Sequence, residues 1–110
     1  MKVSPGFRAF VLGQLEELGD IVPRAMFGGV GLYCDGVFFG LIADDTLYLR
    51  ADNENRPAFE SAGAQPFTPY PGRSRSMRYY SVPIGVLESG VDVTDWARKA
   101  LAAARRESKD

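Results

Sequence analysis

Residues 37–50 read VFFGLIADDTLYLR, two extended segments joined by a tight turn. The first segment, 37–43, is apolar on both faces, which is typical of a central strand covered by helices. In the second segment, 46–50, leucines alternate with Tyr48 and Arg50, so the two faces of the strand differ in polarity. Two aspartates fill the turn between the segments. The pattern predicts an antiparallel hairpin at the centre of a sheet.

Further strand signals lie on both sides of this hairpin. Residues 26–34, MFGGVGLYC, read as one extended strand interrupted by glycines. The next two residues, Asp35 and Gly36, form a strong hairpin signal because both positions tolerate a positive φ. Later in the chain, residues 67–70 are broken by prolines and are expected at a sheet edge, and residues 77–82 form a strand rich in aromatics.

Three main helices are expected around these strands. The first follows Ser4, a good N-cap, and ends before Gly19. Its apolar stripe consists of Phe7, Phe10, Val11, Leu15 and Leu18. A short second helix ends at Gly63, and Asp92 caps the last one. The order α-β-β-β-α-β-β-α predicts a two-layer α+β domain around an antiparallel sheet.

Composition limits the class of protein. The 110 residues fit one domain, 1–110, with 45% hydrophobic and 25% charged residues. The net charge of −1 gives no overall basic field that would attract nucleic acid. One cysteine excludes an internal disulfide, and no stretch approaches the roughly 20 apolar residues of a membrane span. We therefore expect a cytoplasmic protein without a membrane partner.

The candidate catalytic and ligand-binding residues are few. The chain has no histidine, the commonest general base and the commonest neutral metal ligand. Cys34 lacks a base to activate it, and the adjacent Asp44 and Asp45 belong to a turn. A phosphate loop at residues 28–31 would require a helix after it, whereas a strand follows. We expect no enzyme, no cofactor and no metal.

Arginines and tyrosines interleave between residues 70 and 80, a composition that can contact a protein or hold phosphates and stack on bases. A solvated loop whose charges protect an edge strand explains the same pattern. A second place for contacts is the strand 26–33, where exposed side chains would suit a protein partner, although core packing explains them as well. The candidate interaction residues are Arg73, Arg75, Arg78, Tyr80, Met26 and Phe27.

Several ordered motifs resemble the N-terminal domain of the TfoX/Sxy family. They are RAMFGGVGLY at 24–33, ADDTLYLR at 43–50, FESAG at 59–63, MRYY at 77–80, and Trp96 with the alanines after it. The resemblance covers nearly the whole chain. It implies a two-layer α+β fold similar to the type III secretion chaperones, which bind proteins and often dimerise.

The resemblance also implies a role. The founding members regulate natural competence as co-activators that work with the cyclic-AMP receptor protein, and they carry a second, C-terminal helical domain that these 110 residues do not include. We therefore expect a non-enzymatic protein-interaction domain of the transcriptional co-regulator type. Its expected partners are transcription machinery and, by analogy with the chaperones, a second copy of itself. Direct nucleic-acid binding through the Arg73–Arg78 segment is the alternative.

Overall fold

A computed structural model describes residues 2–26, 28–68 and 76–108 of the chain. Its helices are α1 (Pro5–Gln14), the 3-10 turn η1 (Glu16–Leu18), α2 (Arg56–Ser61), α3 (Ile84–Leu87) and α4 (Gly90–Ser108). Its strands are β1 (Ile21–Met26), β2 (Gly29–Cys34), β3 (Val37–Ala43), β4 (Thr46–Arg50), β5 (Pro66–Phe67) and β6 (Ser76–Ser81). Within the described residues, none of the helices combines the length and apolar character needed to cross a membrane.

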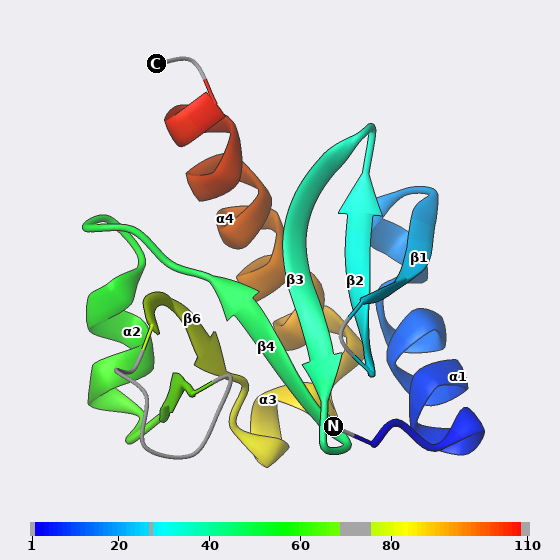
Figure 1. Ribbon diagram of the computed structural model, residues 1–110. Helices are drawn as coiled ribbons and strands as arrows, with labels where there is room; N and C mark the ends of the chain where they lie inside the picture. The colour runs from blue at the N-terminus through cyan, green and yellow to red at the C-terminus, as the bar shows by residue number, and fades with distance from the viewer. Residues whose placement is uncertain (1, 27, 69–75, 109–110) are drawn as a thin grey trace.

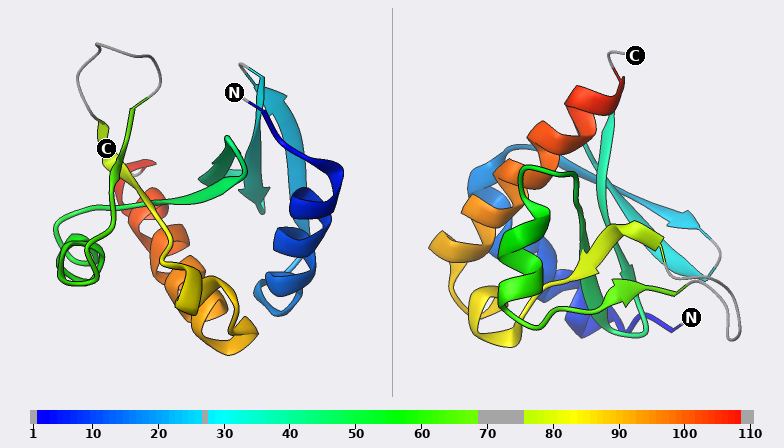
Figure 2. Two further views of the ribbon diagram at one scale, coloured as in Figure 1. Left: turned by 90° about the horizontal axis from the view of Figure 1, so that it is seen from below. Right: turned by 90° about the vertical axis from the view of Figure 1, so that its left-hand side faces the viewer.

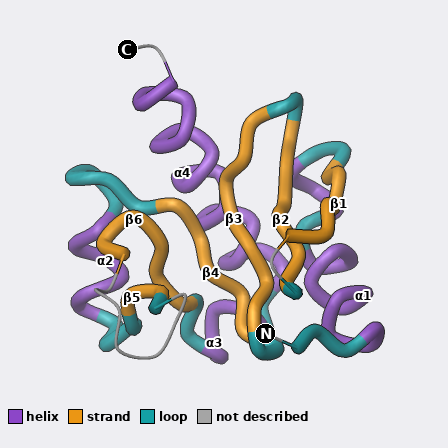
Figure 3. The backbone as a smooth tube through the Cα atoms, in the orientation of Figure 1, coloured by secondary structure: helices purple, strands orange, loops and turns teal. Residues whose placement is uncertain are grey.

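The strands form one antiparallel sheet in the order β1-β2-β3-β4-β6-β5 (Figure 1). Helices α1 and α4 pack behind this sheet, and α2 lies beside the β6 end (Figures 1 and 2). The backbone tube shows the same separation of strands in front and helices behind (Figure 3). The predicted α+β class with an antiparallel sheet is therefore confirmed.

Two-residue turns fix the hairpins on either side of β3. Asp35–Gly36 and the Asp44–Asp45 pair all have positive φ, from 50° to 77°, as the tight hairpin turns require. The second turn also holds the start of the chain. The backbone N–H of Lys2 donates to Asp44 Oδ1 (3.1 Å), and the N–H of Ser4 donates to Asp45 Oδ1 (2.7 Å). These two carboxylates therefore serve the fold.

The core lies between the sheet and the helices behind it. Phe59 of α2 stacks on Tyr80 of β6 at 5.5 Å between ring centroids and meets Trp96 of α4 edge-on at 4.9 Å. The largest side chains with less than 2% exposure are Tyr80, Phe39, Phe59, Leu15, Leu32, Ile42, Leu47, Leu49, Val11 and Val93. They come from α1, β2, β3, β4, α2, β6 and α4, so one core joins both layers.

The structure corrects the boundaries and the number of the predicted strands. The segment 26–34 is not one strand: β1 ends at Met26, Gly28 has a φ of 81°, and β2 begins at Gly29. Met26 and Gly29 face each other at the start of a β1–β2 hairpin. Gly28, which seemed to interrupt one strand, belongs to the turn between two, and Gly29 and Gly31 lie within β2. The described sheet thus has one more strand than predicted.

Smaller corrections concern the helices. Ser4 caps α1 as predicted, since its hydroxyl oxygen accepts a hydrogen bond from the N–H of Phe7 at 3.2 Å. Phe10, however, is 43% exposed and lies off the buried stripe, because the helix turns it away from the core. Helix α4 begins at Gly90, so Asp92 belongs to its first turn and is not its cap.

Candidate interaction surface

One face of the sheet carries no helix in the described part of the chain, and we call it the open face (Figure 2). The prediction that β3 is covered by helices is therefore wrong for this face. Residues paired across strands share a face, and the register pairs Tyr33 with Phe38 and Arg50 with Tyr79. Phe38 of β3, which lies on this face, contacts aromatic neighbours instead of a helix.

Three partly exposed rings from three strands form what we call the aromatic row. Tyr33 of β2 lies 5.1 Å from Phe38 of β3, and Phe38 lies 5.6 Å from Tyr79 of β6, between ring centroids. A second ring pair, Tyr48 and Phe67, meets edge-on at 4.9 Å. Aromatic pairs in such tilted geometries attract each other beyond simple burial. The open face is therefore an ordered aromatic surface.

Gly31 makes room within this surface for a methionine. A Cβ atom at Gly31 would lie 2.7 Å from Met26 Sδ, 3.2 Å from Phe38 Cε1 and 3.3 Å from Tyr33 Cε1. Because glycine lacks that atom, the thioether of Met26 and the edges of the two rings can all lie close to Gly31. A thioether is polarizable and packs well among aromatic side chains. Met26, one of the candidate interaction residues, thus belongs to the open face.

Two guanidinium groups lie over rings of the aromatic row. Arg24 of β1 places its Cζ 5.2 Å from the centroid of Tyr33, and Arg50 of β4 places its Cζ 5.5 Å from that of Tyr79. Arg24 is exposed, whereas Arg50 is only 8% exposed. The buried Arg50 forms an ion pair with Glu107 of α4, although its Nε has no hydrogen-bond partner. Of these two cations, only Arg24 is therefore accessible to a binding partner.

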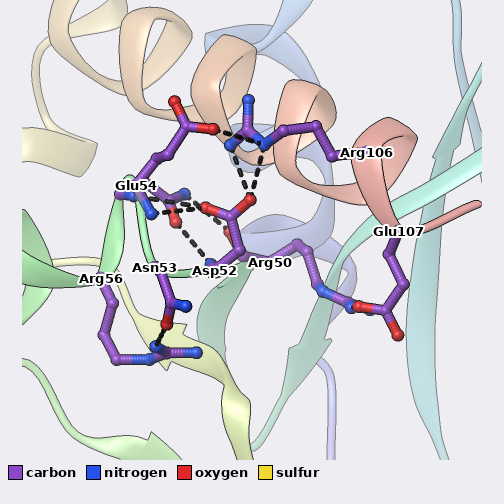
Figure 4. A network of polar contacts seen from close by, with 8 residues as sticks. Arg50, Asp52, Asn53, Glu54, Arg56, Arg106 and Glu107 are labelled. Atoms are coloured by element: carbon purple, nitrogen blue, oxygen red, sulfur yellow. Dashed lines mark hydrogen bonds and ion pairs between the residues drawn. The ribbon is translucent and has the colours of Figure 1, made fainter.

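Further ion pairs attach the end of α4 to the loop after β4 (Figure 4). Arg106 contacts Asp52 at 2.7 Å and Glu54 at 2.9 Å. Asp52 Oδ1 also accepts the backbone N–H groups of Glu54 (3.0 Å) and Asn55 (3.4 Å), which shapes the loop. Arg50, the last residue of β4, lies just before this loop and pairs with Glu107, the residue after Arg106. Ion pairs therefore connect the open face to the last turn of α4.

This ion-pair network makes a pH prediction. Burial raises the pKa of Asp52, but hydrogen bonds from Arg106 and from the backbone of Glu54 and Asn55 outweigh it, so the pKa is lowered overall. A lowered pKa stabilises the fold above the unfolded-state pKa, and this stability disappears as pH falls through the folded-state pKa. We expect Asp52→Asn to lose less stability than the wild type between neutral pH and about pH 3. Urea unfolding at several pH values measures this, and parallel pH profiles would contradict it.

Charge is distributed unevenly between strands and the rest of the chain. The six described strands contain Arg24, Arg50 and Arg78 and no aspartate or glutamate. The 13 carboxylate residues in the described part of the chain lie in turns, helices and connecting segments. The sheet is therefore locally positive although the net charge of the chain is −1.

The structure separates the candidate residues chosen from the sequence. Tyr80 is 1% exposed and packs in the core, so it cannot serve as a surface contact. Arg78, on the same side of β6 as Tyr80, is exposed and pairs with Glu107 at 3.3 Å. Arg73, Arg75 and Phe27 lie outside the described residues.

Sequence reasoning missed most of the open face. Tyr79, the neighbour of the chosen Tyr80, joins the aromatic row, and Arg24 and Phe38 were not singled out at all. The alternation along β6 was a usable signal, because it shows that Tyr79 and Tyr80 face opposite ways. The pairing of β6 with β4 decides whether Tyr79 or Tyr80 points toward the helices, and the alternation alone does not reveal that pairing.

The residues considered for catalysis lie in surroundings that favour a role in the fold. Cys34 is 3% exposed, and burial, followed by the charge of Asp35, raises the pKa of its thiol. A buried thiol with a raised pKa is a poor nucleophile at neutral pH. Among the described residues, no group of three or more potential metal ligands comes together.

A hollow of about 530 Å³ lies between the end of α1 and the start of α4. Polar groups at its wall are used within the protein: Gln14 Nε2 donates to the carbonyl of Leu87 at 2.8 Å, and the hydroxyl of Thr94 donates to the carbonyl of Gln14 at 3.2 Å. Glu16, Glu17 and Arg98 also line it, so its charge is mixed. These hydrogen bonds join helices and favour a structural role for the hollow.

The arrangement is that of a small α+β domain that presents one aromatic sheet face to solvent. The TfoX N-terminal domain family matches residues 13–104, and the chain belongs to this family. DNA transformation protein TfoX1 of Aliivibrio fischeri is 40% identical over 53 residues, which make up 48% of this chain and 25% of that protein. The family match confirms the resemblance seen in the sequence. The alignment with the relative spans only a quarter of that protein's length. The likeness to secretion chaperones stays a prediction.

Proposed function

We propose that the chain is a protein-binding regulatory domain that acts in DNA transformation, and that its partner contacts the open face. The aromatic row is the observation that carries the proposal. Membership of the TfoX N-terminal domain family and the name of the Aliivibrio fischeri relative support the link to transformation. A role without catalysis is part of this proposal, and the burial of Cys34 supports it.

The composition of the open face favours a protein partner. Tyrosine, methionine and arginine are enriched at protein interfaces, and tyrosine and arginine dominate their energetic centres. Tyr33, Met26 and Arg24 meet these criteria within one contiguous patch. An ordered patch also binds at low entropic cost, because its side chains are already held in place.

Nucleic acid fits the same face less well. Single-stranded nucleic acid binds by stacking bases on free ring faces within a positive groove. Here Arg24 lies over Tyr33 and Arg50 lies over Tyr79, so one face of each ring is occupied. The tyrosine at position 80, on which the alternative partly depended, is in the core.

The experiment compares two aromatic truncations in the native host. Tyr33→Ala removes part of the aromatic row, and Phe10→Ala removes an exposed ring from α1. We expect Tyr33→Ala to reduce transformation frequency at least tenfold and to lower transcript levels of the DNA-uptake genes, because a central contact residue is lost. Phe10→Ala should leave both unchanged.

Protein levels and thermal melts of both variants check that folding is intact. A folded, normally expressed Tyr33→Ala variant with wild-type transformation frequency would overturn the proposal. If transformation falls while the transcripts stay constant, the regulatory part of the proposal is wrong.

A further inference from the structure

We propose that the open face binds an acidic segment of a partner protein, in which a carboxylate side chain stands next to apolar ones. This inference rests on the proposed function and adds the chemistry of the partner. It starts from the charge pattern of the sheet, whose described strands contain arginines but no carboxylates. A partner of opposite charge would be attracted to this face and oriented on it.

Arg24 is the cation that remains available. The other two strand arginines, Arg50 and Arg78, both pair with Glu107 of α4. Arg24 has no carboxylate within ion-pair distance among the described residues, and it is exposed. Its charge is therefore free to bind an acid that comes from another molecule.

The position of Arg24 suits a carboxylate in particular. Its guanidinium lies 5.2 Å from the centre of the Tyr33 ring, which restricts the side chain before any partner arrives. A guanidinium can donate two parallel hydrogen bonds to one carboxylate while its flat face stays on an aromatic ring. Little conformational entropy then remains to be lost on binding.

Apolar groups surround this cation on the same face. Val22 lies opposite Tyr33 in the β1–β2 register and is 48% exposed. Met26 lies on the other side of Arg24 along β1, and its Sδ lies beside Gly31, where Tyr33 and Phe38 also meet. An acid that reaches Arg24 therefore brings its neighbouring side chains onto Val22, Met26 and the aromatic row, where apolar side chains would be buried.

A phosphate backbone is a poorer match to this arrangement. Nucleic-acid affinity grows with the number of phosphates that cations neutralise. On the open face, the charge of Arg50 is already balanced by Glu107, which leaves Arg24 as the available cation among the described strand residues. A surface with one available cation among apolar side chains is complementary to a peptide segment in which one or two carboxylates stand among apolar residues.

The test selects random 12-residue peptides by display on the full chain and on its Arg24→Glu variant. We expect peptides selected on the wild type to be enriched in aspartate or glutamate next to aromatic or aliphatic residues, and this acidic enrichment to vanish on Arg24→Glu. Fluorescence anisotropy of the best acidic peptide should show at least tenfold weaker binding to Arg24→Glu and to Tyr33→Ala. Arg8→Glu, which reverses an exposed arginine on α1, should bind as the wild type does.

Three results would overturn the inference. Selected peptides could lack acidic residues, the acidic peptide could bind Arg24→Glu as tightly as wild type, or a 15-nucleotide single strand could bind in a salt-dependent manner where no peptide does. The first two results leave the proposed function standing if Tyr33→Ala still reduces transformation. Loss of the proposed function is recognised separately, by unchanged transformation in that variant.

Discussion

Replacing Phe59 by alanine is expected to lower the free energy of unfolding by about 3–5 kcal/mol. The ring is 1% exposed, stacks on Tyr80 and meets Trp96 edge-on, so it joins α2, β6 and α4. Truncation leaves a cavity between three elements that pack against one another, and they cannot all move in to fill it. Because small domains are stable by only about 5–15 kcal/mol, this is a large part of the total. Urea unfolding followed by circular dichroism measures the loss.

Two other phenylalanine variants serve as controls. Phe59→Leu keeps much of the volume and should cost less than about 1.5 kcal/mol. Phe10→Ala removes an exposed ring and should change stability by at most about 0.5 kcal/mol. A loss below about 1 kcal/mol in Phe59→Ala would show that the contact of α2 with the core is weaker than the structure indicates.

A single methyl group at Gly40 is expected to cost about 1–3 kcal/mol. An added Cβ would lie 2.8 Å from the backbone oxygen of Tyr48 and 3.1 Å from Leu49 Cδ2. The oxygen belongs to the strand paired with β3, so it cannot move without distorting the β3–β4 ladder. Gly40→Ala should therefore lower the urea midpoint and perturb the strand that carries Arg50.

Gly13→Ala is the matched control for this substitution. It also adds one methyl group, but within α1 and with no atom within 4 Å of the new Cβ. Alanine in a helix is favoured over glycine by about 1 kcal/mol, so this variant should gain stability. The two substitutions are expected to have opposite signs. A Gly40→Ala protein as stable as wild type would contradict the close approach of β3 and β4.

Features decided by neighbouring residues were predictable from the sequence. The turns at Asp35–Gly36 and Asp44–Asp45 and the capping serine of α1 all depend on contacts within a few residues. The β1–β2 hairpin was not predicted, because a glycine pair such as Gly28–Gly29 is compatible with either an interrupted strand or a turn. Pairing between Met26 and Gly29 decides between them, and β2 in turn pairs with β3.

The open face was harder to predict, because its residues come together only through pairing of distant strands. Phe38 and Tyr79 are far apart in sequence, and β6 reaches the row only by pairing with β4. The sequence favoured Tyr80, whereas the register puts it against Leu49 in the core and turns Tyr79 outward. Similarly, nothing local links Arg50 to Glu107, so the burial of that arginine had no sequence signal.

From the order of strands in the sheet we also expect an order of folding. Strands β1 to β4 are neighbours both along the chain and in the sheet, so they can zip together through short loops. Strand β6 must instead pass α2 and β5 before it reaches β4, and closing this longer loop is slower. Because β6 carries Tyr79, we expect the aromatic row to be completed only at this late step. A partner that needs the complete aromatic row would then bind only chains that have finished folding.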